Sequence, residues 1–210
     1  KGHSKAIRSL SFQNEKMYSQ SSDKSIIVWN TKDYSVISTL RIKGHRPNGI
    51  AHTIDYFNDK LYSTQYGGCI QVFDCTSYEE IAELKPPTTT VPGSRVMGPI
   101  TCYDNKLYCG HGDNKIYVWN CEDDSLVTTL TGQRARISHL VADNDKLYSG
   151  SLDGRILVWN RIEGHNLITT LNLPQQGFTQ RLRIYIYNGQ LFAHNGHTIN
   201  IWNCHDLSLV

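Results

Sequence analysis

The sequence lacks the marks of membrane-spanning, secreted and disulfide-stapled proteins. It has no run near the roughly 18 consecutive apolar residues that a spanning helix needs. It has no Asn-x-Ser/Thr acceptor, and its six cysteines include no Cys-x-x-Cys pair. We therefore expect free thiols and a cytoplasmic or nuclear location. Lys1 to Ser4 contain neither an initiator Met nor a signal peptide, so we expect the chain to be a piece of a longer one.

Signals of enzyme chemistry are equally scarce. There is no Gly-x-Ser-x-Gly elbow, and no glycine-rich loop is placed to cradle a phosphate. His194 and His197 could form a metal-ligand pair, but no third ligand lies near them in the sequence. We therefore expect no catalytic residue, no metal and no cofactor.

Net charge is also small. The chain has 21 Lys and Arg residues against 19 Asp and Glu residues, a net charge of +2. This balance argues against binding dominated by a nucleic-acid backbone, although a local basic surface remains compatible with it. The 210 residues are enough for a substantial core, and one domain is the default interpretation.

The strongest feature present is an internal repeat. Five short motifs of the form Lys-Leu-Tyr-Ser begin at Lys16, Lys60, Lys106, Lys146 and Gln190. Each is followed by an apolar run that ends in an aromatic residue, and these aromatic residues are 40 to 46 residues apart. That spacing is the period of one blade of a β-propeller. The aromatic residues are Trp29, Phe73, Trp119, Trp159 and Trp202.

Each repeat is predicted to form four short strands. In the fourth repeat we expect strands at 136–142, 146–151, 155–159 and 166–171, since these runs are β-branched or aromatic and are bounded by turn residues. Asn144-Asp145 is typical of a tight reversal between the first two strands. A single sheet cannot bury both of its faces, whereas radial stacking of blades buries them. The sequence therefore predicts an all-β propeller.

These motifs resemble the WD40-repeat family. In that family a His, a Ser or Thr, an Asp and a Trp form a hydrogen-bonded chain inside each blade, which satisfies buried polar groups. The compact Lys-Leu-Tyr-Ser style is similar to the propellers of TRAF-type RING ligases, F-box proteins, slime-mould α-kinases and plant CCCH zinc-finger WD proteins. The resemblance implies the following members of the chain: His3, Ser19, Asp23, Trp29, Asp113, Trp119, Ser149, Asp153, Trp159 and Trp202.

Only the first repeat matches this pattern in full. The second has Gly67 and Phe73 in place of the Asp and the Trp, the third has Cys109 at the Ser position, and the fourth has Gln133 at the His position. The fifth keeps only its Trp. The strand and turn pattern survives these departures, so the fold prediction stands, with blades of uneven stability.

The predicted domain covers residues 1–210, with repeats at about 2–43, 44–92, 93–131, 132–175 and 176–210. WD40 propellers commonly close with seven blades, so we expect the five repeats to form part of a seven-bladed ring, with adjacent blades or domains in the parent chain. The alternative is a ring that closes with fewer blades.

The predicted binding site is a basic arc at the channel mouth. Every repeat places a cation near the start of its first strand, and pseudo-rotational symmetry would arrange these cations around the mouth. Guanidinium groups pair with carboxylates and phosphates in bidentate fashion. We predict that the arc binds an acidic or phosphorylated peptide or protein. Its residues are Lys5, Arg46, Arg95, Arg134, Arg136, Arg181 and Arg183.

Other functions were weighed against this non-catalytic scaffold or substrate-recruiting module. The first alternative is RNA or another nucleic acid bound by the same basic arc. The second is a hydrolase built on a propeller frame, which the structural roles expected for Asp23, Asp113 and Asp153 disfavour. The proline-containing connection 85–94 is either a binding element or a tolerated insertion.

Overall fold

A computed structural model of the chain describes residues 2–43, 53–64, 68–87, 97–173, 182–196 and 198–210. Within these ranges all regular structure is β-strand, in five separate antiparallel sheets. The strands are β1 (Ile7–Gln13), β2 (Lys16–Ser21), β3 (Ser25–Asn30) and β4 (Val36–Arg41); β5 (Ile54–Phe57), β6 (Lys60–Thr64), β7 (Ile70–Asp74) and β8 (Glu80–Leu84); β9 (Met97–Tyr103), β10 (Lys106–His111), β11 (Ile116–Asn120) and β12 (Leu126–Leu130); β13 (Ile137–Asp143), β14 (Lys146–Ser151), β15 (Arg155–Asn160) and β16 (Leu167–Asn172); and β17 (Arg183–Tyr187), β18 (Gln190–His194) and β19 (Ile199–Asn203).

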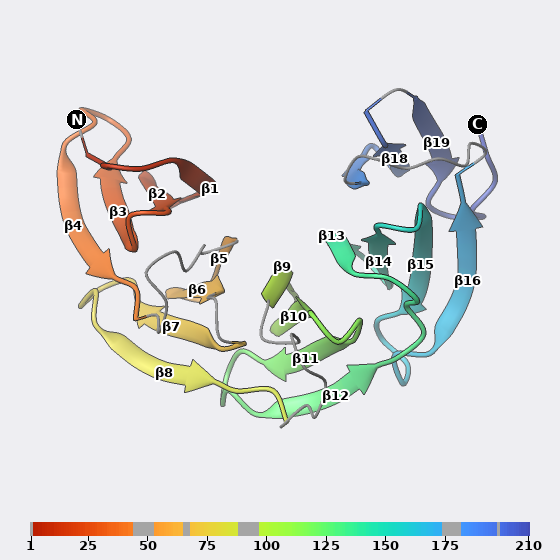
Figure 1. The fold of residues 1–210 in the computed structure, drawn as a ribbon, viewed down its shortest axis with the longest axis horizontal. Coiled ribbons are helices and arrows are strands. Elements are labelled where there is room, and N and C mark those ends of the chain that lie inside the picture. The colour runs from red at the N-terminus through yellow and green to blue at the C-terminus, as the bar shows by residue number, and fades with distance from the viewer. Residues whose placement is uncertain (1, 44–52, 65–67, 88–96, 174–181, 197) are drawn as a thin grey trace.

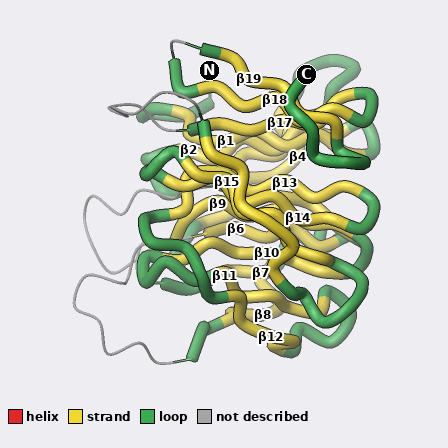
Figure 2. The backbone as a smooth tube through the Cα atoms, turned by 90° about the vertical axis from the view of Figure 1, so that its right-hand side faces the viewer, coloured by secondary structure: helices red, strands yellow, loops and turns green. Residues whose placement is uncertain are grey.

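The five sheets are arranged as the blades of an open arc (Figure 1). The first strand of a blade lies on the concave side, and the fourth strands β4, β8, β12 and β16 lie on the outer rim. Figure 2 shows the strands running across the thickness of the arc, with successive blades one above another and their turns gathered on the two sides. The fifth sheet has three strands, and its chain continues into a single bridge between Trp202 and Leu209.

The strands predicted for the fourth repeat agree with β13 to β16 to within one residue at each boundary. The first turns also form as expected. Asn58, Asp104, Asn144 and Asn188 all have positive φ, a conformation that Asn and Asp adopt more readily than most side chains. The repeat pattern therefore predicts both the strands and the reversals between them.

The core lies between neighbouring blades. The third strands β7, β11 and β15 are buried along most of their length and β3 at its centre, as their apolar side chains on both faces predict. One buried cluster joins the second and third blades through Ile70, Val72, Leu107 and Trp119, and the other junctions are built in the same way. Radial stacking therefore buries the faces that a single sheet would expose.

Three recurring cysteines contribute to these junctions. The thiols of Cys75, Cys121 and Cys204 are buried, and each follows the third strand of its blade. Each contacts a tyrosine hydroxyl on the second strand of the preceding blade: Tyr18, Tyr62 and Tyr148, respectively. Burial is the main reason that the pKa of each tyrosine is raised, and the thiol adds to it. All six cysteines are free thiols.

Candidate functional site: the channel mouth

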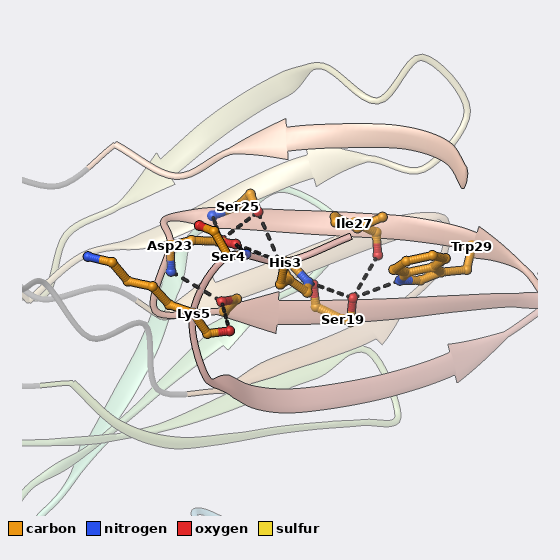
Figure 3. A network of polar contacts seen from close by, with 9 residues as sticks. His3, Ser4, Lys5, Ser19, Asp23, Ser25, Ile27 and Trp29 are labelled. Atoms are coloured by element: carbon orange, nitrogen blue, oxygen red, sulfur yellow. Dashed lines mark hydrogen bonds and ion pairs between the residues drawn. The ribbon is translucent and has the colours of Figure 1, made fainter. Parts of the chain in front are cut away.

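The polar chain inside the first blade connects all four residues of the WD40 pattern (Figure 3). The ring nitrogens of His3 lie 2.8 Å from Ser19 Oγ and 3.0 Å from Asp23 Oδ2. The Trp29 indole N–H donates to Ser19 Oγ at 2.7 Å. Burial alone would raise the pKa of Asp23, but hydrogen bonds from Ser25, Ser4 and His3 hold it at about 2. This network fastens the segment before β1 to β2 and β3.

The fourth blade keeps part of this chain of hydrogen bonds. Gln133 Nε2 donates to Ser149 Oγ at 2.6 Å, and the Trp159 indole N–H donates to the same oxygen at 2.8 Å. Asp153 is bonded instead to Ser151 and Arg155 in the turn before β15. The structure therefore differs from the predicted hydrogen-bond chain at Asp153. The amide of Gln133 has one nitrogen, which donates to Ser149, and its oxygen cannot donate to a carboxylate.

The third and fifth blades depart further. Asp113 pairs with His111 at 2.9 Å and accepts a hydrogen bond from the Tyr117 hydroxyl at 2.8 Å. The Trp119 indole N–H is buried with no hydrogen-bond partner among the described residues, so the structure differs from the predicted chain at Trp119. The physical reason is Cys109, whose thiol occupies the Ser position and donates to the Gly110 carbonyl. Trp202 is buried in the core of the fifth blade.

A hollow of about 400 Å³ opens on the concave side of the arc, at the start of the first strands. We call it the channel-mouth pocket. Three arginines from three blades line it: Arg8, Arg136 and Arg183. No Asp or Glu is among its described lining residues, so its charge is positive. The other lining residues are Ser9, Leu10, Thr53, Gly98, Pro99, Ile137, Ser138, His139 and Leu152.

The predicted basic arc is only partly gathered at this pocket. Arg136 and Arg183 line it, whereas Lys5 and Arg134 are exposed and lie outside its lining. Arg46, Arg95 and Arg181 lie outside the described residues. Arg8, which lines the pocket, was missed by sequence reasoning. It sits at an irregularity in the pairing of β1 with β2, inside the strand and not in the loop before it.

His139 places a neutral donor beside these cations. Its Nδ1 accepts the backbone N–H of Ile184 at 3.0 Å. Burial is the main reason that the pKa of His139 is lowered, and the charges of Arg183 and His194 lower it further. The imidazole is therefore neutral at pH 7, and its proton resides on Nε2, because Nδ1 is the acceptor.

The floor of the pocket is held by side chains that reach from one blade to the next. At one equivalent position of each of three blades, a side chain accepts a hydrogen bond from a backbone N–H of the next blade. Ser9 Oγ accepts from the Ile54 N–H at 3.3 Å, and Thr53 Oγ1 accepts from the Ile100 N–H at 3.2 Å. His139 Nδ1 accepts from the Ile184 N–H in the same way. Ser138 adds a donor, from its hydroxyl to the Leu182 carbonyl at 2.7 Å. The pocket is thus lined by residues fixed by the junctions, which favours a preformed binding site.

The described residues contain no group of three or more His, Cys, Asp or Glu side chains arranged to hold a metal ion. His197 lies outside the described residues, so the pair with His194 is not placed. No helix that could span a membrane occurs in the described part of the chain.

Blades of this geometry, with a His–Ser–Asp–Trp chain in the first of them, define a WD40-type β-propeller. The family model of the WD domain, G-beta repeat, matches residues 1–30 and 124–160. With the repeat pattern and the fold, this match supports a similarity of the chain to the WD40-repeat family.

The chain is similar to several known proteins. It is 25% identical over 127 residues to myosin heavy chain kinase C of Dictyostelium discoideum, a match that covers 60% of this chain and 15% of the kinase. The chain thus matches only a small share of that relative's length. The computationally designed Ika8 protein aligns with all of this chain and 62% of its own, with a TM-score of 0.81 and 19% identity. The designed Ika4 protein aligns with 76% of this chain and 93% of its own, with a TM-score of 0.65 and 21% identity. These two structures support the fold alone.

Proposed function

We propose that this chain is a non-catalytic recruiting module whose channel-mouth pocket binds an acidic or phosphorylated segment of a partner protein. WD40 repeats generally mediate protein interactions. The observation that carries the finer proposal is the pocket itself, where Arg8, Arg136 and Arg183 converge without a carboxylate among the described lining residues. A dianionic phosphate offers more acceptor oxygens to these guanidinium groups than a carboxylate does.

The expected test uses one peptide sequence carrying phosphoserine, aspartate or serine at a central position. Binding to the full chain is measured by fluorescence anisotropy. Phosphoserine should bind more tightly than aspartate, and serine weakest. Since a charged hydrogen bond contributes about 1.5 to 3 kcal/mol, the R136E/R183E variant should lose at least about tenfold in affinity for phosphoserine.

Arg134→Glu is the matched control, because Arg134 carries the same charge two residues away and lies outside the pocket lining. It should change affinity by less than about twofold. Circular dichroism confirms that each variant is folded. Equal losses in R134E and R136E/R183E would overturn the proposed site, as would equal binding of the serine and phosphoserine peptides.

Nucleic acid is the second candidate, since the same three arginines would also bind phosphate groups of RNA. If RNA were the ligand, the logarithm of its affinity would fall steeply with the logarithm of salt concentration, while a slope near zero would remove this candidate. A hydrolytic role has less support, because Asp23, Asp113 and Asp153 are engaged in hydrogen bonds inside the blades.

We also propose that the repeats act beside other blades or domains of a parent chain, in the cytoplasm or the nucleus. The similarity to a part of myosin heavy chain kinase C supports this arrangement, in which the repeats recruit and another domain acts. The domain limits 1–210 and the seven-bladed ring stay predictions.

A further inference from the structure

A second hollow, of about 630 Å³, lies between the fourth and fifth blades. It is lined at the end of β13 that is opposite to the channel-mouth pocket, and by the turns that follow β13, β17 and β19. We call it the junction hollow. The residues that matter here are Asp143, Asn144, Tyr148, Asn188 and Cys204.

At this junction a carboxylate stands where the second and third blades have an aromatic ring. Phe57 and Tyr103 occupy the position of Asp143 in the second and third blades, since each pairs with the lysine that begins the next strand. Both aromatic rings pack against the buried core between blades. A carboxylate at the same place cannot fill that volume. The fourth blade therefore lacks the ring of the second and third blades and, unlike the first blade with Gln13 at this position, carries a charge there.

A second contact of the repeat is missing here as well. Lys60 reaches across its junction to the Cys121 carbonyl at 2.8 Å, and Lys16 reaches the Cys75 carbonyl at 3.2 Å. Lys146, at the equivalent position, instead pairs with the adjacent Asp145 at 3.0 Å. Lys146 lines the hollow together with Asp145, and this ion pair compensates its charge.

The junction between the third and fourth blades shows what fits such a space. Arg161 lies there, only 5% exposed, and its Nε donates to the Asn144 carbonyl at 2.8 Å. Its Nη1 pairs with Asp104 at 3.0 Å, and its guanidinium stacks on the Tyr103 ring at 4.5 Å. A planar cation is thus held by a turn carbonyl, a carboxylate and a ring.

The junction hollow has the same turn positions but no arginine, because the recurring cysteine, also present as Cys75 and Cys121, stands where the preceding junction has Arg161. Cys204 stands at the position of Arg161, as their equivalent bonds to the carbonyls of Gly189 and Asp145 show. The turn residue Asn188 corresponds to Asn144, and Asp143 to Tyr103. The carboxylate at the preceding junction, Asp104, comes one residue after Tyr103, whereas Asp143 stands at the position of Tyr103 itself. The Asp143 side chain has no hydrogen bond or ion pair with any described residue.

We propose that the junction hollow binds an arginine side chain of a partner protein. The guanidinium would pair with the Asp143 carboxylate and donate to the Asn188 carbonyl, as Arg161 does at the preceding junction. Arginine fits better than lysine, because its planar fork can serve two acceptors at once. This site is distinct from the channel mouth in position and in the charge of its ligand.

The test uses a Gly-Ser peptide with one central arginine, titrated into the ¹⁵N-labelled full chain. The backbone signals of Asn188 and Gly189 should shift as the peptide binds. Asp143→Asn should weaken binding about tenfold, since it keeps the shape and removes the charge. Cys204→Arg, which supplies an internal arginine as at residue 161, should abolish the shifts.

Two comparisons make the result decisive. Glu163→Gln removes an exposed carboxylate outside the hollow and should leave binding unchanged. Peptides with citrulline or lysine in place of arginine should bind at least about tenfold more weakly. Equal binding of the citrulline peptide, or an unchanged affinity in D143N, would overturn the proposal. D143N decides the matter if C204R does not fold.

Discussion

At the scale of single residues, equivalent positions in the blades have different polar partners. Trp119 and Trp159 occupy the same place in the repeat and are both buried, yet only the Trp159 N–H has an acceptor, Ser149 Oγ. The residue that faces the indole N–H accounts for the difference: it is Ser149 in the fourth blade and Cys109 at the equivalent position of the third. A buried donor without an acceptor costs free energy, so the third blade carries a penalty that the fourth does not.

This difference predicts that Trp→Phe lowers the free energy of unfolding by different amounts at positions 119 and 159. Trp→Phe removes the same ring atoms at either position, but only at Trp159 does it also remove a hydrogen bond. We expect W159F to lower the free energy of unfolding by about 1 kcal/mol more than W119F does. Chemical denaturation of both variants measures the gap. An equal loss, or a larger one in W119F, would mean that the indole N–H of Trp119 is satisfied in solution.

At the scale of strands and junctions, the sequence predicts much of the fold. Strand limits follow from the Lys-Leu-Tyr-Ser motif and its turn, because both are local signals. Arg136 and Arg183 were predicted for the site from their place at the first strands. Arg8 was missed because an irregularity inside β1 is not visible in a repeat alignment. The junction hollow was missed because it exists only between two blades, as the joint result of Asp143 and Cys204.

The junctions also differ in their response to pH. The N–H of Ile184 is accepted by His139, which titrates, while the N–H of Ile100 is accepted by the Thr53 hydroxyl, which does not. The folded-state pKa of His139 is lowered, so its contribution to stability is present above the unfolded value of about 6.5 and is lost as the pH falls below it. Acid should therefore weaken the junction between the fourth and fifth blades more than the junction between the second and third.

Hydrogen exchange measures this effect at the two amides. Between pH 7.5 and pH 5.5, after correction for intrinsic rates, the protection of Ile184 should fall by at least about threefold, while that of Ile100 stays constant. Replacing His139 with Gln, which keeps an acceptor but does not titrate, should remove the pH dependence. A parallel fall at both amides would point to general loosening of the arc and not to His139.

At the scale of the whole molecule, the chain has two hollows, for which we propose ligands of opposite charge. The channel-mouth pocket is lined by three arginines, and the junction hollow by Asp143 together with the ion pair of Asp145 and Lys146. They lie at opposite ends of β13, so about six residues of strand, or roughly 20 Å, separate them. One recruiting module could therefore hold an acidic and a basic segment together.

Separate sites should behave additively. R136E/R183E should leave the affinity for the arginine peptide within about twofold, and D143N should do the same for the phosphoserine peptide, because distant substitutions rarely couple. Calorimetric titration of each peptide in the presence of the other checks this independence. A change of tenfold or more in either cross-measurement would show that the two ends of β13 communicate.

The paired tyrosines and cysteines make the rate of thiol alkylation a measure of how often neighbouring blades separate. Cys75, Cys121 and Cys204 are buried, and each lies under a tyrosine of the preceding blade, so a thiol reagent reaches each one only when its junction separates. The rate at which each cysteine is alkylated then reports how often that pair of blades parts. Mass spectrometry of the alkylated peptides would rank three of the four junctions by opening frequency in one sample, without an added label.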